Sequence, residues 1–235
     1  METPERQQAR EWPTLVGVTA VLQKVTFAFN RSPFVLLVEV PAERAASVIE
    51  RWLKRYPELL ATPQEQTALR KFGHPAPGLI AASSGPQVAL FLVVNRPGEE
   101  PRFQREQFVD AREGGLVWRH YLLGPHVQRQ TWSWWLCADK AAHYRRTVNG
   151  LILGAKYGNV EGRARRLEEL FRHLNTYPMG GGLREQVFEL QRYARRQWRI
   201  HRQGRESEVR DLVLPVIPRI PRVKQREVPL SDLAP

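Results

Sequence analysis

Short apolar runs separated by turn residues characterise the first part of the chain. Residues 14–29 are rich in Val, Thr and Phe, and apolar residues alternate at the end of this segment, so we expect a strand there. Further runs predict a strand at 34–40 and hairpins formed by 79–82 with 88–94 and by 116–123 with 127–136, the second turning at Gly124-Pro125. The polar residues 1–13 are expected to form a loose leader, and the charged, aperiodic residues 99–114 a loop.

Helical spacing of apolar residues occurs twice in this first part and dominates after it. After Pro41, a single apolar stripe from Ala45 to Tyr56 predicts a helix, and the capping box Thr62-Pro63-Gln64-Glu65 starts another that ends near Phe72. Beyond Asp139, apolar stripes predict three more helices, around 144–152, at 163–174 and from 183 to about 202.

The pattern as a whole predicts an α+β fold. An antiparallel sheet region (14–136) precedes a basic helical region (137–205), either within one layered domain or as two domains. The last segment, 206–235, carries prolines that forbid a helix interior, yet it keeps branched aliphatic residues. We expect this tail to lie extended along the protein or along a partner.

The charge of the chain is concentrated in its helical region. Residues 1–117 hold 14 Lys and Arg against 13 Asp and Glu, 118–205 hold 17 against 6, and 206–235 hold 5 against 5. Such an asymmetry is typical of a protein that binds a polyanion. Arginine supplies 30 of the 36 basic residues, which suits phosphate contact but also a bacterial genome that favours arginine codons.

The last helix carries the strongest signal for a binding surface. Five arginines with successive spacings of 3, 1, 3 and 3 residues share one face, opposite an apolar face formed by Leu183, Val187, Leu190, Ala194 and Trp198. Five like charges repel one another, so a phosphate backbone is the expected partner, with a solvated face or acidic neighbours as the alternative. Glu185 and Glu189 are expected to lie too far along the helix to neutralise this row: Arg192, Arg195, Arg196, Arg199 and Arg202.

Two further features could add to that surface. Gly180-Gly181-Gly182 precedes the helix N-terminus and, with Arg184, predicts an anion site, although a plain hinge fits equally well. The second hairpin is rich in tryptophan, and its outward face is expected to stack on bases unless the tryptophans are core residues. The candidate residues on this hairpin are Trp118, Arg119, Arg129, Trp132 and Trp134, and additional basic candidates beyond it are Arg145, Arg146, Lys156, Arg163, Arg165 and Arg166.

Catalytic and metal-binding signatures are weak. The six histidines form no His-x-His pair or His-Glu-x-x-His motif, and Cys137 is the only cysteine, so no metal and no cofactor is expected. A metal-independent RNA-cleaving enzyme needs only a general base and a cation, which His120 or His143 could supply with Tyr144 and nearby arginines. Enzymatic activity is therefore the less favoured interpretation.

The leading hypothesis is a non-catalytic nucleic-acid-binding protein of a bacterial cell, forming part of a larger nucleoprotein assembly. Other protein subunits would bind through the C-terminal tail. With no apolar run of about 18 residues, no membrane is involved, and a cytoplasmic location is expected. Phosphate contacts carry no sequence information, so DNA and RNA both fit. The alternatives are the RNA-cleaving enzyme and an adaptor that docks on an acidic protein partner.

Overall fold

The computed structural model describes residues 3–126, 130–154, 159–178, 180–201, 212–218 and 226–233. The fold is α+β, as predicted. The chain divides into unit 1, residues 1–116 with 222–235, and unit 2, residues 117–221. The boundary falls before the tryptophan-rich hairpin and not after it, because that hairpin bonds to the last helix: Gly182 N–H donates to Ser133 Oγ, and Leu136 N–H donates to Gln186 Oε1.

A six-stranded sheet forms the centre of unit 1. Its strand order is β5-β2-β4-β3-β1-β9, and its pairs are antiparallel except for β1 with β3, which is parallel. The predicted antiparallel sheet is therefore confirmed for the described strand pairs other than β1 with β3. The strands are β1 (Pro13–Val16), β2 (Phe34–Pro41), β3 (Gly78–Ser84), β4 (Gln87–Val94), β5 (Val109–Asp110) and β9 (Arg226–Pro229).

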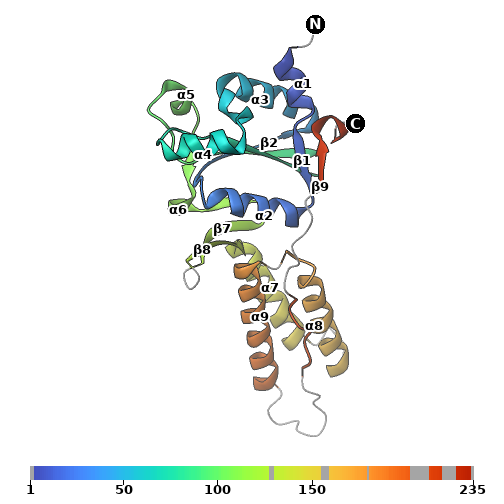
Figure 1. The fold of residues 1–235 in the computed structure, drawn as a ribbon. Coiled ribbons are helices and arrows are strands. Elements are labelled where there is room, and N and C mark those ends of the chain that lie inside the picture. Colours follow the sequence, from blue (N-terminus) through green and yellow to red (C-terminus); the bar gives the residue numbers. More distant parts are fainter. Residues whose placement is uncertain are drawn as a thin grey trace. The chain divides into compact units, whose positions relative to one another are not determined.

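Helices cover both faces of this sheet (Figure 1). On one face lie α1 (Pro4–Arg10) and α3 (Ala42–Arg55), and on the other lies α2 (Val18–Phe29). Alternate residues of β4, such as Leu90 and Leu92, share a core with Ile49 and Trp52 of α3. The other residues of β4 point to the opposite face. Burial on both faces explains why β4 is an almost continuous apolar run.

The predicted strand over residues 14–29 is wrong for most of its length. Only β1 is extended, and the chain turns at Gly17, whose φ of 100° suits glycine, before entering α2. The buried residues Val21, Val25 and Phe29 recur every four positions, as one helix face requires. The alternation that suggested a strand rested on Phe27, which is 61% exposed.

Other local predictions in unit 1 had mixed outcomes. The capping box is confirmed, because Glu65 N–H donates to Thr62 Oγ1 and Thr62 N–H donates to Glu65 Oε2, and it begins α4 (Pro63–Lys71) after the short helix η1 (Pro57–Leu60). The predicted leader instead forms α1, with Ala9 in the core. The predicted loop over 99–114 holds α5 (Pro101–Gln104), β5 and α6 (Ala111–Gly114), anchored by the buried Phe103 and Ala111.

Unit 2 combines a small sheet with three helices. The strands β6 (Leu116–Trp118), β7 (Tyr121–His126) and β8 (Thr131–Leu136) form the sheet, in that order. The turn predicted at Gly124-Pro125 is wrong, since both residues lie within β7 opposite Ser133 and Trp132. The helices are α7 (Ala138–Leu153), α8 (Val160–Leu174) and α9 (Gly181–Ile200).

The C-terminal segment is used by the chain itself. Residues 212–218 run extended against α8 and α9, with Leu212, Leu214 and Ile217 buried (Figure 1). Two side-chain amides bind the backbone of this segment. Gln191 Nε2 donates a hydrogen bond to the Pro215 carbonyl at 2.8 Å, and Asn175 Nδ2 donates one to the Val216 carbonyl at 2.9 Å. Farther on, β9 joins β1, and η4 (Leu230–Leu233) follows it. The predicted extended tail thus agrees with residues 212–218 and β9, whereas the short helix η4 was not predicted.

None of the helices in the described ranges is both long enough and apolar enough to cross a lipid bilayer.

Candidate functional site

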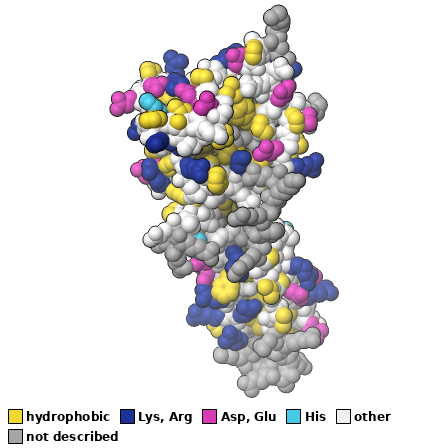
Figure 2. All heavy atoms as spheres, in the orientation of Figure 1, with side chains coloured by type: hydrophobic (Ala, Val, Ile, Leu, Met, Phe, Trp, Pro, Cys, Tyr) yellow, Lys and Arg dark blue, Asp and Glu magenta, His cyan; other side chains and the backbone are white. Residues whose placement is uncertain are grey.

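The positive charge of the chain belongs to unit 2. Residues 117–221 hold 19 Lys and Arg against 9 Asp and Glu, a net charge of +10, whereas unit 1 holds 17 against 15, a net charge of +2. On the face that Figure 2 shows, basic side chains predominate over unit 2, while both signs are interspersed over unit 1. A field of one sign on one unit favours association with an anionic partner.

Helix α9 presents its arginines much as its spacing predicts. Four of the five residues expected inward, Leu183, Val187, Ala194 and Trp198, are buried, while Leu190 is half-buried. On the other side Arg192, Arg196 and Arg199 are exposed and Arg195 is half-buried. Arg202 lies outside the described residues. The described arginines form one continuous cationic face.

One expectation about the acidic neighbours of this row is wrong. Glu189 forms an ion pair with Arg192 one helical turn away, while Glu185 lies 3.1 Å from Nε2 of the buried His126. The pair between Glu189 and Arg192 is exposed, so it contributes about 1 kcal/mol or less and yields readily to a competing anion. Within the described ranges, no carboxylate pairs with Arg195, Arg196 or Arg199.

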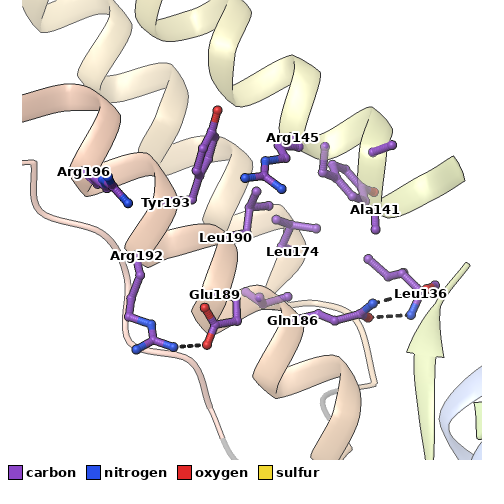
Figure 3. A pocket seen from close by; sticks show the side chains of 13 residues that line it. Leu136, Ala141, Arg145, Leu174, Gln186, Glu189, Leu190, Arg192, Tyr193 and Arg196 are labelled. Atoms are coloured by element: carbon purple, nitrogen blue, oxygen red, sulfur yellow. Dashed lines mark hydrogen bonds and ion pairs between the residues drawn. The ribbon is translucent and has the colours of Figure 1, made fainter. Parts of the chain in front are cut away.

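A groove of about 580 Å³ lies beside the arginine face, between α7 and α9. Its floor is largely aliphatic, and three arginines stand around it (Figure 3). The lining residues are Leu136, Ala141, Ala142, Tyr144, Arg145, Leu174, Gln186, Val187, Glu189, Leu190, Arg192, Tyr193 and Arg196. We call it the α7–α9 groove. Its size falls within the range of about 300–1,000 Å³ seen for small-molecule sites.

Tyr193 and Phe188 are aromatic residues of this surface that the sequence analysis missed. Tyr193 donates its hydroxyl to Asn149 Oδ1 at 2.7 Å, and the Arg145 guanidinium carbon lies 4.3 Å from the centre of its ring. Phe188 is 48% exposed, with Arg192 over its ring at 5.2 Å. A helical projection could have placed both near the arginine row, but the partners from α7 could not be inferred from α9 alone.

Two of the tryptophans predicted to stack on bases are core residues. Trp118 is 1% exposed and Trp134 is 4% exposed, so neither offers a ring face to a ligand, and that prediction is wrong for both. Trp132 is half-buried, and the exposed Arg119 lies over the Trp118 ring at 5.1 Å. Arg129 lies outside the described residues. The hairpin therefore serves mainly as the packing surface for α9.

Gly182, in the first turn of α9, serves close packing, and its N–H is not open to an anion. The N–H of Gly182 already donates to the buried Ser133 Oγ at 2.7 Å. The ring of Trp135 lies directly against Gly182, where an added Cβ would come within 2.6 Å of the ring carbon Cε2. The predicted phosphate site at this N–H is therefore wrong. Arg184 is half-buried, and its Nε lies buried without a hydrogen-bond partner among the described residues.

Replacing Gly182 by alanine is expected to lower the free energy of unfolding by about 1–3 kcal/mol. The new methyl group would overlap Trp135 and lie 2.8 Å from the Trp134 carbonyl oxygen, which is backbone and cannot move aside cheaply. Urea denaturation followed by circular dichroism measures the change. Gly180→Ala is the matched control, because Gly180 has a φ of −63° and open space around its Cβ position. Equal stabilities of the two variants would contradict the packing described here.

Among the remaining basic candidates, three are exposed and one, Arg163, is hydrogen-bonded to the backbone of α7. Arg146, Arg165 and Arg166 are exposed, and Arg165 lies 3.6 Å from Glu169. Arg163 is half-buried and donates a hydrogen bond to the Ile152 carbonyl at 3.2 Å, which holds α8 against the end of α7. It is therefore not free to bind phosphate, contrary to the prediction. Lys156 lies outside the described residues.

A cluster of histidine and tyrosine surrounds Tyr144 of α7, which also lines the α7–α9 groove. Its centre is the pair Tyr144 and Tyr177, whose hydroxyl oxygens are 2.5 Å apart. His143 contacts the Tyr144 ring, and His120 contacts the Tyr177 ring at 5.8 Å between ring centres. His173, which the sequence analysis did not single out, also contacts Tyr177. The two histidines proposed as bases thus meet the same tyrosine pair.

Burial shifts the pKa of His120 and Tyr144 in this cluster and of two residues beside it. It lowers the pKa of His120, helped by the charges of Lys140 and Arg119, so that imidazole is neutral near pH 7. Burial, reinforced by the hydrogen bond to Tyr177, raises the pKa of Tyr144, and burial raises that of Tyr121 to about 12. Burial and then the charge of Asp139 raise the pKa of the Cys137 thiol. The cluster offers a neutral base and phenol donors, but no activated nucleophile.

In the described part of the chain, no three His, Cys, Asp or Glu side chains come together in a way that could hold a metal ion.

No protein-family model matches the chain, and no curated protein shows significant similarity to it.

Proposed function

We propose that the protein binds nucleic acid through the phosphate backbone, with the arginine face of α9 as the contact surface. The observation that carries the proposal is the alignment of Arg195, Arg196 and Arg199 on one side of α9 without a carboxylate partner in the described residues. Unpaired guanidiniums held on a rigid helix are well suited to phosphate, which they bind through paired N–H donors. Arg192 joins them when an anion displaces Glu189.

The charge distribution supports this proposal over a merely soluble surface. Surfaces that serve solubility alone usually intersperse charges of both signs, as unit 1 does, whereas unit 2 carries a net charge of +10. Phe188 and Tyr193 add aromatic surface beside the arginines, the combination used for stacking on bases. In this proposal Phe188 and Tyr193 of α9, and not the hairpin tryptophans, stack on the bases.

Binding is expected to weaken steeply with salt. If four arginines of α9 each neutralise one phosphate, log K falls by about 0.9 per contact for a duplex, or about 0.7 for a single strand, for each tenfold rise in salt. Between 50 and 200 mM salt this is a loss of affinity of roughly 150-fold for a duplex and roughly 50-fold for a single strand. Fluorescence anisotropy with labelled single- and double-stranded DNA and RNA measures it. An affinity that stays flat over this range for all four probes would overturn the proposal and favour an acidic protein as the partner.

A further inference from the structure

The α7–α9 groove combines two kinds of surface that a single ligand must match. Its floor is built from aliphatic side chains such as Leu136, Leu174 and Leu190. A phosphate or carboxylate is not stable there, because a charged group loses its hydration without gaining partners. The part of the ligand that enters must therefore be apolar on its faces.

The edge of the same groove is positively charged and attracts an anionic group of a ligand. Arg145, Arg192 and Arg196 line it, against the single acidic residue Glu189, which leaves a net charge of +2. Arg145 and Arg196 are exposed and have no carboxylate partner among the described residues. A ligand that fits both surfaces has a flat apolar body and an anionic edge, which is the chemistry of a nucleotide.

One end of the groove holds a prepared stacking platform. The Tyr193 ring is fixed by its hydrogen bond to Asn149, and Arg145 reaches from α7 to lie over it (Figure 3). Bases stack on aromatic rings and on guanidinium planes alike. Because the Tyr193 ring is already held by its hydrogen bond to Asn149, the entropic cost of binding is reduced.

The groove also offers few free neutral hydrogen-bonding groups that could distinguish one base from another. The Gln186 amide, its main neutral polar group, is already engaged at both ends, since it accepts from Leu136 N–H at 2.7 Å and donates to the Leu136 carbonyl at 3.3 Å. Stacking without edge contacts tolerates any base. An acidic amphipathic helix would match the charge, but it would gain nothing from the Arg145–Tyr193 stack.

We propose that the α7–α9 groove receives an unpaired base, so that the nucleic acid this protein binds is single-stranded. This inference rests on the proposed backbone binding by α9. Bases in a duplex are paired and stacked, and extracting one costs a few kcal/mol. A single strand offers its bases without that cost, while its phosphates follow Arg196 and Arg199 along α9.

The test compares three labelled 12-mers by fluorescence anisotropy: single-stranded oligothymidine, the matched duplex, and an abasic strand with the same phosphates. Wild type is expected to bind oligothymidine about tenfold or more tighter than either other probe, as one stacked base provides. Leu190→Trp fills the groove and is expected to reduce oligothymidine binding to the abasic level with an unchanged salt slope. Leu153→Trp is the matched control, because Leu153 is 57% exposed on α7 and does not line the groove.

Tyr193→Leu removes the platform and is expected to cause the same loss, which keeps the test decisive if Leu190→Trp does not fold. Equal, salt-sensitive binding of all three probes would overturn the base site while leaving backbone binding intact. Absence of salt-sensitive binding to any probe would overturn both proposals. Binding of an acidic amphipathic peptide that Leu190→Trp abolishes, with oligothymidine binding unaffected, would assign the groove to a protein partner.

Discussion

Replacing Trp118 by alanine is expected to lower the free energy of unfolding by about 3–5 kcal/mol, a large part of the stability of a domain of this size. The Trp118 side chain is among the largest that are fully buried, and only 1% of it is exposed. Its removal loses the transfer free energy of the indole and leaves a cavity that β6 and its neighbours cannot fill. Urea denaturation monitored by tryptophan fluorescence and circular dichroism measures the loss.

Val117→Ala is the control for Trp118→Ala, because Val117 is the preceding residue of the same strand and is 52% exposed. A surface change of this kind is expected to shift the free energy of unfolding by roughly 0.5 kcal/mol or less. If Trp118→Ala left stability unchanged and instead weakened nucleic-acid binding, Trp118 would be a stacking residue at the surface, and its buried position in β6 would be wrong.

The sequence predicts secondary structure well where one period persists over several turns. The stripe from Ala45 to Tyr56 became α3, and the apolar run 88–94 became β4. In α2, three alternating residues suggested a strand, although burial follows a helical spacing over the whole helix. The error arose because Phe27 is an exposed aromatic residue, which no local pattern distinguishes from a buried one.

The arginine face could be predicted because it depends on one helix alone. Spacing along α9 fixes which side chains share a side, whatever surrounds the helix. The roles of Trp134 and Gly182 depend instead on how β8 meets α9, a contact between residues almost fifty positions apart. The same holds for Tyr193, whose platform is completed by Arg145 and Asn149 from another helix. Such tertiary contacts leave no periodic trace in the sequence.

Replacing Arg195, Arg196 and Arg199 together by glutamine is expected to weaken nucleic-acid binding by roughly a hundredfold or more at 0.1 M salt. On a single strand each phosphate contact contributes about 0.7 to the slope of log K against log salt, so the slope itself is expected to fall by about 2. Glutamine has a similar helix propensity and keeps a polar end on a shorter side chain, while it removes the charge and the paired guanidinium donors. Anisotropy titrations at four or more salt concentrations measure both quantities.

The decisive control removes the same net charge from unit 1. Arg44, Arg51 and Arg105 are exposed there, and their triple glutamine variant is expected to keep nearly the full slope, since long-range effects of exposed charges are screened within about 10 Å at 0.1 M salt. Equal losses in the two triple variants would show that net charge alone drives binding, with no defined face. An α9 variant that binds as tightly as wild type would exclude this helix as the backbone contact. In either case the placement of the arginines on α9 would have no part in recognition.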